Sequence, residues 1–283
     1  MAMRSLGEAT AFVTGGASGI GLGLARALAE NGARVAVADL RADHLAQAHA
    51  LAASEGWDDR FLGLQLDVAD REAFAGALDE TEQRLGPLRI LINNAGVGIA
   101  GPIADATYGD WDWGLSVNLG GVVNGLVAGL PRLRAHGLGG HIVNTASLGA
   151  LMPARPTRGI YATAKAGLIA LTEHLRLDLQ GSGIGVSVLL PGPTLSNIHQ
   201  SEQLRPADLP GSDLFVENFT AERPTAIPWQ DPAIAGRMTI DAILSDRLYI
   251  VTHPEYLSAV KARNAAIEEA VGRAAKSGEM GND

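Results

Sequence analysis

The sequence contains no cysteine among its 283 residues. This absence excludes disulfide bonds, thiolate catalysis and cysteine-ligated zinc. Basic residues are also few, because 22 lysines and arginines stand against 31 acidic residues and give a net charge of −9. That charge, without any basic cluster, disfavours nucleic acid as a partner. None of the seven histidines has a metal-ligand spacing, so we expect no metal site.

Long hydrophobic runs are missing as well. No stretch of the chain has the ~18 uninterrupted apolar residues of a membrane-spanning helix, and the N-terminus lacks the pattern of a signal peptide. We therefore expect no membrane association and a cytoplasmic location.

Short apolar runs rich in β-branched residues alternate along the chain with longer amphipathic segments. The runs cover residues 10–14, 34–39, 61–67, 88–93, 141–146, 184–190 and 248–252, and helical patterns cover segments such as 22–30, 71–85, 108–133 and 160–179. Because the runs are apolar throughout, both faces of each strand should be buried, as in a parallel sheet flanked by helices. The alternation predicts an α/β fold with a doubly wound, Rossmann-like parallel sheet, in a single domain spanning residues 1–283.

Two regions depart from this alternation. Residues 194–232 are rich in Pro, Ser, Asp and Asn, and long insertions of this kind in a compact domain are usually functional. We expect this segment to form a lid over the substrate. Residues 270–283 lose their apolar periodicity, which predicts a frayed tail or an oligomer contact.

A glycine-rich turn, Thr14–Gly21, follows the first predicted strand and opens a helix. Its glycines (Gly15, Gly19 and Gly21, with Ser18 and Ile20 between them) let the backbone turn tightly beside a pyrophosphate, whose charge the helix N-terminus stabilises. A glycine-rich turn alone could be only a turn. The strand before it, the helix after it and the acidic Asp39 at the end of the second strand together predict a dinucleotide site.

Asp39 also predicts which dinucleotide binds. A carboxylate at this position can accept hydrogen bonds from both adenosine ribose hydroxyls and repels a 2′-phosphate, so we expect NAD rather than NADP. Arg41 is the opposing observation, since a guanidinium could pair with that phosphate. The alternative for Arg41 is a solvated arginine that opens the next helix.

Two further strand ends carry small or polar residues suited to the same cofactor. Asp67 and Val68 follow the third strand, where a contact with the adenine ring would fit, although Asp67 could equally be a turn or capping residue. Asn94, Ala95 and Gly96 follow the fourth strand. Small residues there would let the dinucleotide lie close across the carboxyl edge of the sheet.

Tyr161 and Lys165 lie four residues apart in a predicted helix, so both can point into one cleft. A cation near a phenol favours the phenolate and lowers a pKa that starts near ~10, which makes the tyrosine a usable acid/base. Ser147, at the end of an apolar strand, could hydrogen-bond the oxygen that gains or loses charge. The Tyr-x-x-x-Lys spacing alone is also compatible with plain surface packing.

Together these motifs resemble the short-chain dehydrogenase/reductase family, in order and spacing, over residues 8–195. The resemblance implies that Tyr161 is the catalytic acid/base, that Ser147 orients the substrate oxygen, and that Lys165 binds the nicotinamide ribose and depresses the tyrosine pKa. It further implies that Asn118 supports a water relay to the lysine. Pro191 and Gly192 match the family as well, and Thr194 or Ser196 could take the place of a threonine that touches the nicotinamide carboxamide.

The end of the chain differs from this family pattern. The glycine-rich ending common among tetrameric members is missing, so we expect a homo-oligomer that is either a dimer or a tetramer. A finer likeness is to bacterial Cα-dehydrogenases that act on lignin-type aryl-ether benzylic alcohols. The segments that carry it include 108–113, 117–125, 146–149, 196–198 and 204–206.

The resemblance implies an NAD-dependent enzyme that interconverts a secondary alcohol and a ketone. Six apolar side chains could line an apolar or aromatic substrate pocket or simply pack the lid on the core: Leu148, Leu151, Met152, Phe215, Phe219 and Trp229. A steroid, terpene or polyol alcohol remains an alternative substrate. A non-catalytic NAD-binding protein is the alternative from another class, and a sugar-nucleotide epimerase is disfavoured because its glycine spacing and larger C-terminal domain are absent.

Overall fold

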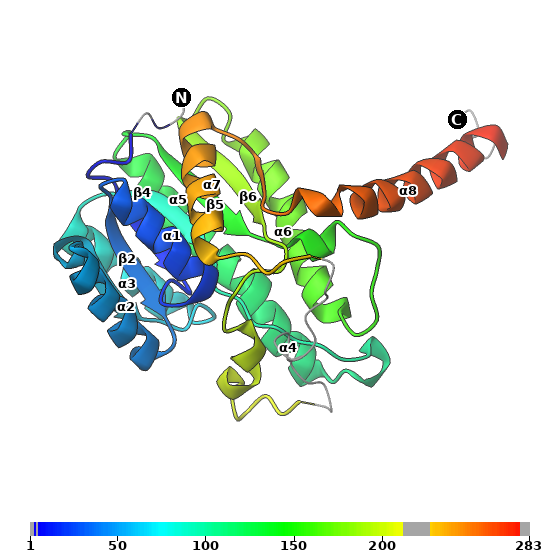
Figure 1. Ribbon diagram of the computed structural model, residues 1–283, viewed down its shortest axis with the longest axis horizontal. Helices are drawn as coiled ribbons and strands as arrows, with labels where there is room; N and C mark the ends of the chain where they lie inside the picture. The colour runs from blue at the N-terminus through cyan, green and yellow to red at the C-terminus, as the bar shows by residue number, and fades with distance from the viewer. Residues whose placement is uncertain (1–2, 4, 212–226, 278–283) are drawn as a thin grey trace.

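The computed structural model describes residues 3, 5–211 and 227–277 of the chain. One parallel sheet of seven strands forms its centre, in the order β3-β2-β1-β4-β5-β6-β7 (Figure 1). The strands are β1 (Thr10–Thr14), β2 (Arg34–Asp39), β3 (Phe61–Gln65), β4 (Leu88–Asn93), β5 (Gly140–Thr145), β6 (Ile184–Leu190) and β7 (Tyr249–Val251). The predicted doubly wound α/β fold is confirmed, and the strand order reverses between β1 and β4, where ligands bind in such sheets.

Helices cover both faces of the sheet, as the continuous apolar strands require. One face carries α1 (Gly19–Glu30), α2 (Ala42–Glu55) and α7 (Pro232–Ser245), and the other carries α3 (Arg71–Leu85), α5 (Gly121–Ala135) and α6 (Gly159–Asp178). Short 3₁₀ turns lie at η1 (Asp58–Arg60), η2 (Ile103–Asp105), η4 (Leu148–Ala150), η5 (Ile198–Leu204) and η6 (Pro254–Tyr256). The core therefore consists of two apolar layers with the sheet between them.

The helix expected over residues 108–133 is divided into three parts. It begins as α4 (Tyr108–Leu115), passes through a π-helical turn, η3 (Ser116–Gly120), and continues as α5. Thr107 and Asp110 form a capping box at its start. Such π-turns often mark functional positions, and this one holds Asn118 at its centre.

The combined helix Tyr108–Ala135 is long and apolar enough to cross a membrane by length and composition alone. In the fold it packs against the sheet and against α3, with Val122 and Leu133 buried. One side of this helix therefore belongs to the core of the domain.

Several element boundaries differ from those expected. β3 ends at Gln65, so Asp67 lies in the following turn. The segment 270–277 belongs to helix α8 (Leu257–Ser277), so the prediction of a frayed tail is wrong for those residues. Its alanines favour helix, and Glu269 pairs with Arg273 one turn later.

The segment predicted as a lid is described over residues 194–211 and 227–231. It contains η5 and a single bridge between Thr194 and Gln230. Helix α7 ends the segment, with Asp231 as the capping residue and Pro232 in its first turn. Phe215 and Phe219 lie outside the described residues.

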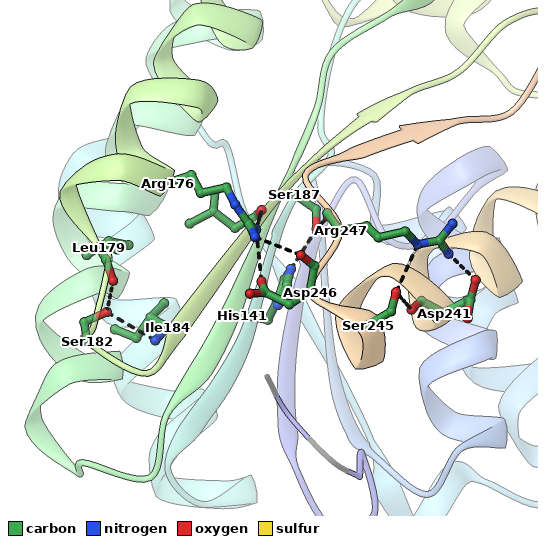
Figure 2. Close-up of polar contacts among 11 residues, drawn as sticks. His141, Arg176, Leu179, Ser182, Ile184, Ser187, Asp241, Ser245, Asp246 and Arg247 are labelled. Carbon is green, nitrogen blue, oxygen red and sulfur yellow. Dashed lines mark hydrogen bonds and ion pairs between the residues drawn. The ribbon is translucent and has the colours of Figure 1, made fainter. Parts of the chain in front are cut away.

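A polar cluster involves β5, β6 and the segment that follows α7 (Figure 2). Nε2 of the fully buried His141 is 2.8 Å from Oγ of Ser187, and this hydroxyl donates to the Arg247 carbonyl at 2.6 Å. Arg176 pairs with Asp246 at 2.9 Å beside them. Burial lowers the pKa of His141 to about 4, so the imidazole is neutral at neutral pH.

Candidate active site

A cavity of about 1170 Å³ runs along the carboxyl edge of the sheet. It extends from Asp39 at the end of β2, past the β1–α1 turn, to Tyr256 near the C-terminal helix. Every residue that the sequence singled out for the cofactor or for catalysis lines it, from Gly15 to Thr194. The topology thus gathers the predicted set at one edge of the sheet.

The β1–α1 turn has a conformation that requires glycine. Gly15 and Gly19 have positive φ angles of 59° and 50°, and a Cβ on Gly15 would lie 2.9 Å from the Cα of Ala95. A Cβ on Gly21 would overlap with the Gly15 carbonyl oxygen. The turn is therefore free of side chains where the backbone amides and the N-terminus of α1 face the cavity, which is the geometry that suits a pyrophosphate.

Asn94 fixes this turn to the end of β4. Its amide nitrogen donates to the carbonyls of Thr14 and Gly15 at 3.1 and 3.3 Å, and its amide oxygen accepts from the Thr145 hydroxyl at 3.3 Å. The Thr14 hydroxyl in turn accepts from the backbone amides of Asn94 and Ala95. Asn94 therefore joins the ends of β1, β4 and β5 and stabilises the backbone around the site.

Asp39 presents its carboxylate at the far end of the cavity. It accepts from the Ala17 amide at 3.2 Å and from the Arg41 amide at 3.1 Å, which orients both oxygens. The Arg41 guanidinium, which also borders the cavity, pairs with Asp43 at 2.6 Å and donates to Gln200 at 3.4 Å, directly before α2 begins. A carboxylate held in place here, beside a glycine turn with no side chains, fits the adenosine ribose of NAD.

Asp67 and Val68 line the same end of the cavity. The Asp67 carboxylate accepts from the Ala69 amide at 2.9 Å, so it stabilises the turn after β3 as well as facing the cavity. Val68 is buried and packs against the position of Gly121 in α5. Both alternatives considered for Asp67, turn residue and cavity contact, are compatible with this geometry.

Tyr161 and Ser147 meet at the other end. Tyr161 is half-buried in the first turn of α6, and Ser147, two residues after the end of β5, hydrogen-bonds its phenol. Burial raises the pKa of Tyr161, and the Ser147 hydrogen bond and the positive charge of Arg158 oppose that rise. The net effect favours the neutral phenol.

Lys165 lies beside Tyr161 in the same cleft, and its expected effect on the tyrosine pKa stays a prediction. Its ammonium donates to the Thr145 carbonyl at 2.9 Å and lies 5.7 Å from the centre of the Tyr161 ring. Lys165 is buried, and burial lowers its own pKa to about 8. Arg158, which precedes α6, is a further cation near the phenol, and its charge lowers the pKa of Tyr161.

Asn118 is completely buried in the π-turn below Lys165. Its oxygen accepts from the Val97 amide at 3.1 Å, and its nitrogen donates to the carbonyls of Val97 and Gly114 at 3.0 and 2.9 Å. A Cβ on Gly96 would lie 2.8 Å from the Asn118 oxygen and 3.4 Å from Nζ of Lys165. Gly96 therefore keeps open the narrow space between the amide and the ammonium.

A buried chain of amides holds helix α6 against the sheet. Asn93 donates to Asn144 at 2.9 Å, and Asn144 donates to the Thr172 hydroxyl of α6 at 3.0 Å. Because Tyr161 and Lys165 belong to the same helix, this chain fixes their height above β4 and β5.

Pro191, Gly192 and Thr194 form the wall after β6. The Pro191 carbonyl accepts from the Leu148 amide at 3.0 Å, and a Cβ on Gly192 would lie 2.6 Å from the His253 ring. The Thr194 hydroxyl donates to the Gly192 carbonyl at 3.1 Å. Ser196 lies against the glycine turn, 2.8 Å from where a Cβ on Gly19 would be.

The part of the cavity beyond Tyr161 is mainly apolar. Leu148, Met152 and Trp229 line it as expected, whereas Leu151 packs into the core beside β6 instead. The buried side chain of Trp113 also borders the cavity.

The described part of the lid is anchored to α4. The Arg205 guanidinium lies 3.0 Å from the fully buried carboxylate of Asp110 and 4.3 Å from the centre of the Trp113 ring. Nearby, the Gly98 amide donates to the Ser201 hydroxyl at 2.9 Å. Leu204, Pro206 and Leu209 thereby form one wall of the cavity. Sequence reasoning noted Arg205 only as part of a likeness, because nothing local identifies a partner 95 residues away.

Comparison with known proteins agrees with this geometry. A family model described as short chain dehydrogenase matches residues 9–206. The C alpha-dehydrogenase of Sphingobium sp. strain SYK-6 is 40% identical over 273 residues, which cover 95% of this chain and 88% of that protein.

Solved structures show the same relationship. A short chain dehydrogenase/reductase from Burkholderia phymatum in complex with NAD matches with a TM-score of 0.87 at 30% identity, covering 95% of this chain and 97% of that chain. A short-chain dehydrogenase from Novosphingobium aromaticivorans matches with a TM-score of 0.81 at 39% identity, covering 94% and 88%. The chain therefore belongs to the short-chain dehydrogenase family.

Proposed function

We propose that the protein is an NAD-dependent oxidoreductase that interconverts a secondary alcohol with an aromatic body and the corresponding ketone. One observation carries this proposal: a single cavity joins the glycine turn and Asp39 at one end to Ser147, Tyr161 and Lys165 at the other. The first end suits the adenosine of a dinucleotide and the second suits its reacting nicotinamide, so the two ends of the cavity match the two ends of an extended dinucleotide.

The side chains around the reacting oxygen divide the work of proton transfer. Tyr161 exchanges the proton of the alcohol, and the Ser147 hydroxyl donates to the oxygen as charge develops on it. Lys165, one turn further along α6, would hold a ribose hydroxyl of the cofactor, and Asn118 fixes the backbone at Val97 and Gly114. The bound NAD supplies the hydride acceptor and a positive charge on its oxidised ring.

The raised pKa of Tyr161 favours the neutral phenol, which is the proton donor for reduction of a ketone. Oxidation of an alcohol needs the phenolate instead, and Ser147 and Arg158 favour that form. Proton transfer should therefore limit oxidation more strongly than reduction at neutral pH.

Two observations support an aromatic substrate. The wall beyond Tyr161 contains Leu148, Met152, Trp113 and Trp229, and the relative from Sphingobium is named a C alpha-dehydrogenase. A benzylic alcohol that carries an aryl ether fits both. A cytoplasmic location and assembly as a homo-oligomer are part of the proposal.

The test is NADH absorbance with purified protein against a panel of secondary alcohols, with NAD and NADP in parallel. The panel contains benzylic aryl ethers, aliphatic alcohols, steroids, terpenes and polyols. Reduction of NAD with an aryl carbinol is the expected result. Activity confined to the other alcohols would keep the mechanism and reject the aromatic substrate, and NADH binding without turnover on any alcohol would favour a non-catalytic NAD-binding protein.

A further inference from the structure

Helix α8 projects from the body of the molecule (Figure 1). Its principal contact is with the 3₁₀ turn η6 that precedes it, so most of its length is exposed to solvent. Leu257, Ile267 and Val271 are 59%, 50% and 65% exposed despite being large and apolar. An isolated helix of this length is only marginally stable in water unless an apolar face is packed.

The apolar side chains of α8 follow a heptad repeat. Counting Leu257 as position a, the a and d positions over the described side chains are Leu257, Val260, Asn264, Ile267, Val271 and Ala274. Four of the six are large and apolar, and alternating spacings of three and four residues place all six on one stripe of the helix. A repeat of this kind is typical of a helix that pairs with another helix along its length.

The positions beside the stripe carry charges of opposite sign. Arg263 occupies position g and Glu268 occupies position e of the following heptad. In a parallel pair of helices these two positions face each other across the seam, so each Arg263 would meet the Glu268 of the second copy. Glu269 and Arg273 lie on the outer face, where they pair within the helix at 3.1 Å.

Asn264 selects between the two possible directions of the pair. In a parallel pair, heptad position a of one helix faces heptad position a of the other. The two Asn264 amides therefore lie side by side and can hydrogen-bond each other. In an antiparallel pair Asn264 would face Ile267 and lose that partner. A single polar residue of this kind specifies register and direction in paired helices.

We propose that α8 is a dimerisation helix that pairs in parallel with the α8 of a second copy of this chain. The stripe from Leu257 to Ala274 forms the seam, the Asn264 pair sets the register, and the contacts between Arg263 and Glu268 flank it. Because the contact is the same on both chains, the arrangement has two-fold symmetry and closes at two copies. Arg263 also borders the rim of the large cavity, so the seam begins beside the proposed active site.

The absence of cysteine makes this proposal directly testable in the full-length protein. Asn264→Cys places one thiol in the seam, and Ala262→Cys places one thiol on the opposite face of the same helix as the matched control. Both variants are oxidised with glutathione disulfide and run on non-reducing gels. We expect Asn264→Cys to move from the 29.4 kDa band to twice that mass, and Ala262→Cys to remain at one chain.

A second measurement is independent of disulfide chemistry. Ile267→Glu places a charge in the seam, and Ala266→Glu places one outside it, and light scattering on a sizing column gives the mass of each. We expect Ile267→Glu to lower the number of associated chains and Ala266→Glu to leave it unchanged. The proposal would be overturned if the two cysteine variants cross-linked equally or if the two glutamate variants had equal masses. It would also be overturned if cross-linking occurred only in a mixture of Asn264→Cys with Ile267→Cys.

Discussion

The buried His141 should make the stability of this protein depend on pH in a specific window. Its imidazole is neutral in the fold because burial lowers its pKa to about 4, whereas an unfolded histidine titrates near ~6.5. Between these two values the unfolded chain binds a proton that the folded chain does not. The free energy of unfolding therefore falls as the pH is lowered through this window and recovers as it is raised.

The magnitude follows from the size of the shift. The difference between the folded pKa of about 4 and the ordinary value of 6.5 corresponds to roughly 3 kcal/mol of unfolding free energy, at about 1.4 kcal/mol for each pH unit. This amount is lost once the pH has fallen through the whole window. At pH 5 roughly 2 kcal/mol of that should already be lost. Burial makes the charged form of the ring unfavourable. The hydrogen bonds in Figure 2 set the tautomer of the neutral ring: Ser187 gives its proton to the Arg247 carbonyl, so Nε2 of His141 donates to Ser187.

The assay compares the unmodified protein with His141→Gln, whose amide nitrogen can take the place of Nε2 without titrating. Urea unfolding followed by circular dichroism at pH 7.5, 6 and 5 gives the free energy of unfolding of each. Carboxylates titrate similarly in both proteins, so the difference between their pH slopes isolates the histidine. Equal slopes for the two proteins between pH 6.5 and 5 would refute the assignment of a buried neutral imidazole.

Four further predictions follow from the site and its lid. Asp39→Ala should raise the kcat/KM for NADP relative to NAD in steady-state assays, and an unmodified enzyme that already prefers NADP would contradict the role of the carboxylate. Arg205→Met leaves the Asp110 carboxylate buried without its cation and should lower the free energy of unfolding by about 3–5 kcal/mol in urea titrations. Adding Asp110→Asn to this variant should recover much of the loss, and no recovery would argue against the ion pair. Gly96→Ala pushes a methyl group to 2.8 Å from the Asn118 oxygen and should reduce kcat and NADH affinity, whereas Gly76→Ala, with nothing within 4 Å, should leave both unchanged. Because the pKa of Tyr161 is raised, alcohol oxidation should increase toward alkaline pH and ketone reduction should not; coincident pH–rate profiles would contradict this.

Much of the fold could be predicted from the sequence because its signals are local. Continuous apolar runs identified β1, β2, β4 and β6 with their observed bounds. The glycine turn was predictable for the same reason, since its positive φ angles need glycine whatever surrounds it. The division of the long helix at Asn118 was not predictable, because a π-turn depends on the contacts of a buried side chain with Val97 on another segment.

The site was predictable in its members but not in its electrostatics. Spacing along α6 placed Tyr161 and Lys165 in one cleft, yet it could not show that the ammonium is held by the Thr145 carbonyl. Nor could it show that burial raises the pKa of the phenol, or that Arg158 adds a second positive charge near it. These effects depend on distances across the fold, and the same holds for the pairing of Arg205 with Asp110.

The most direct test of the proposed reaction is the initial rate of NADH formation from NAD and a benzylic aryl-ether alcohol, for the unmodified protein and for Tyr161→Phe. NADH binding, followed by fluorescence, shows that the variant keeps its cofactor site. We expect turnover in the unmodified protein and loss of turnover in Tyr161→Phe with NADH binding retained. Full activity in Tyr161→Phe would contradict the assignment of the tyrosine as the acid/base.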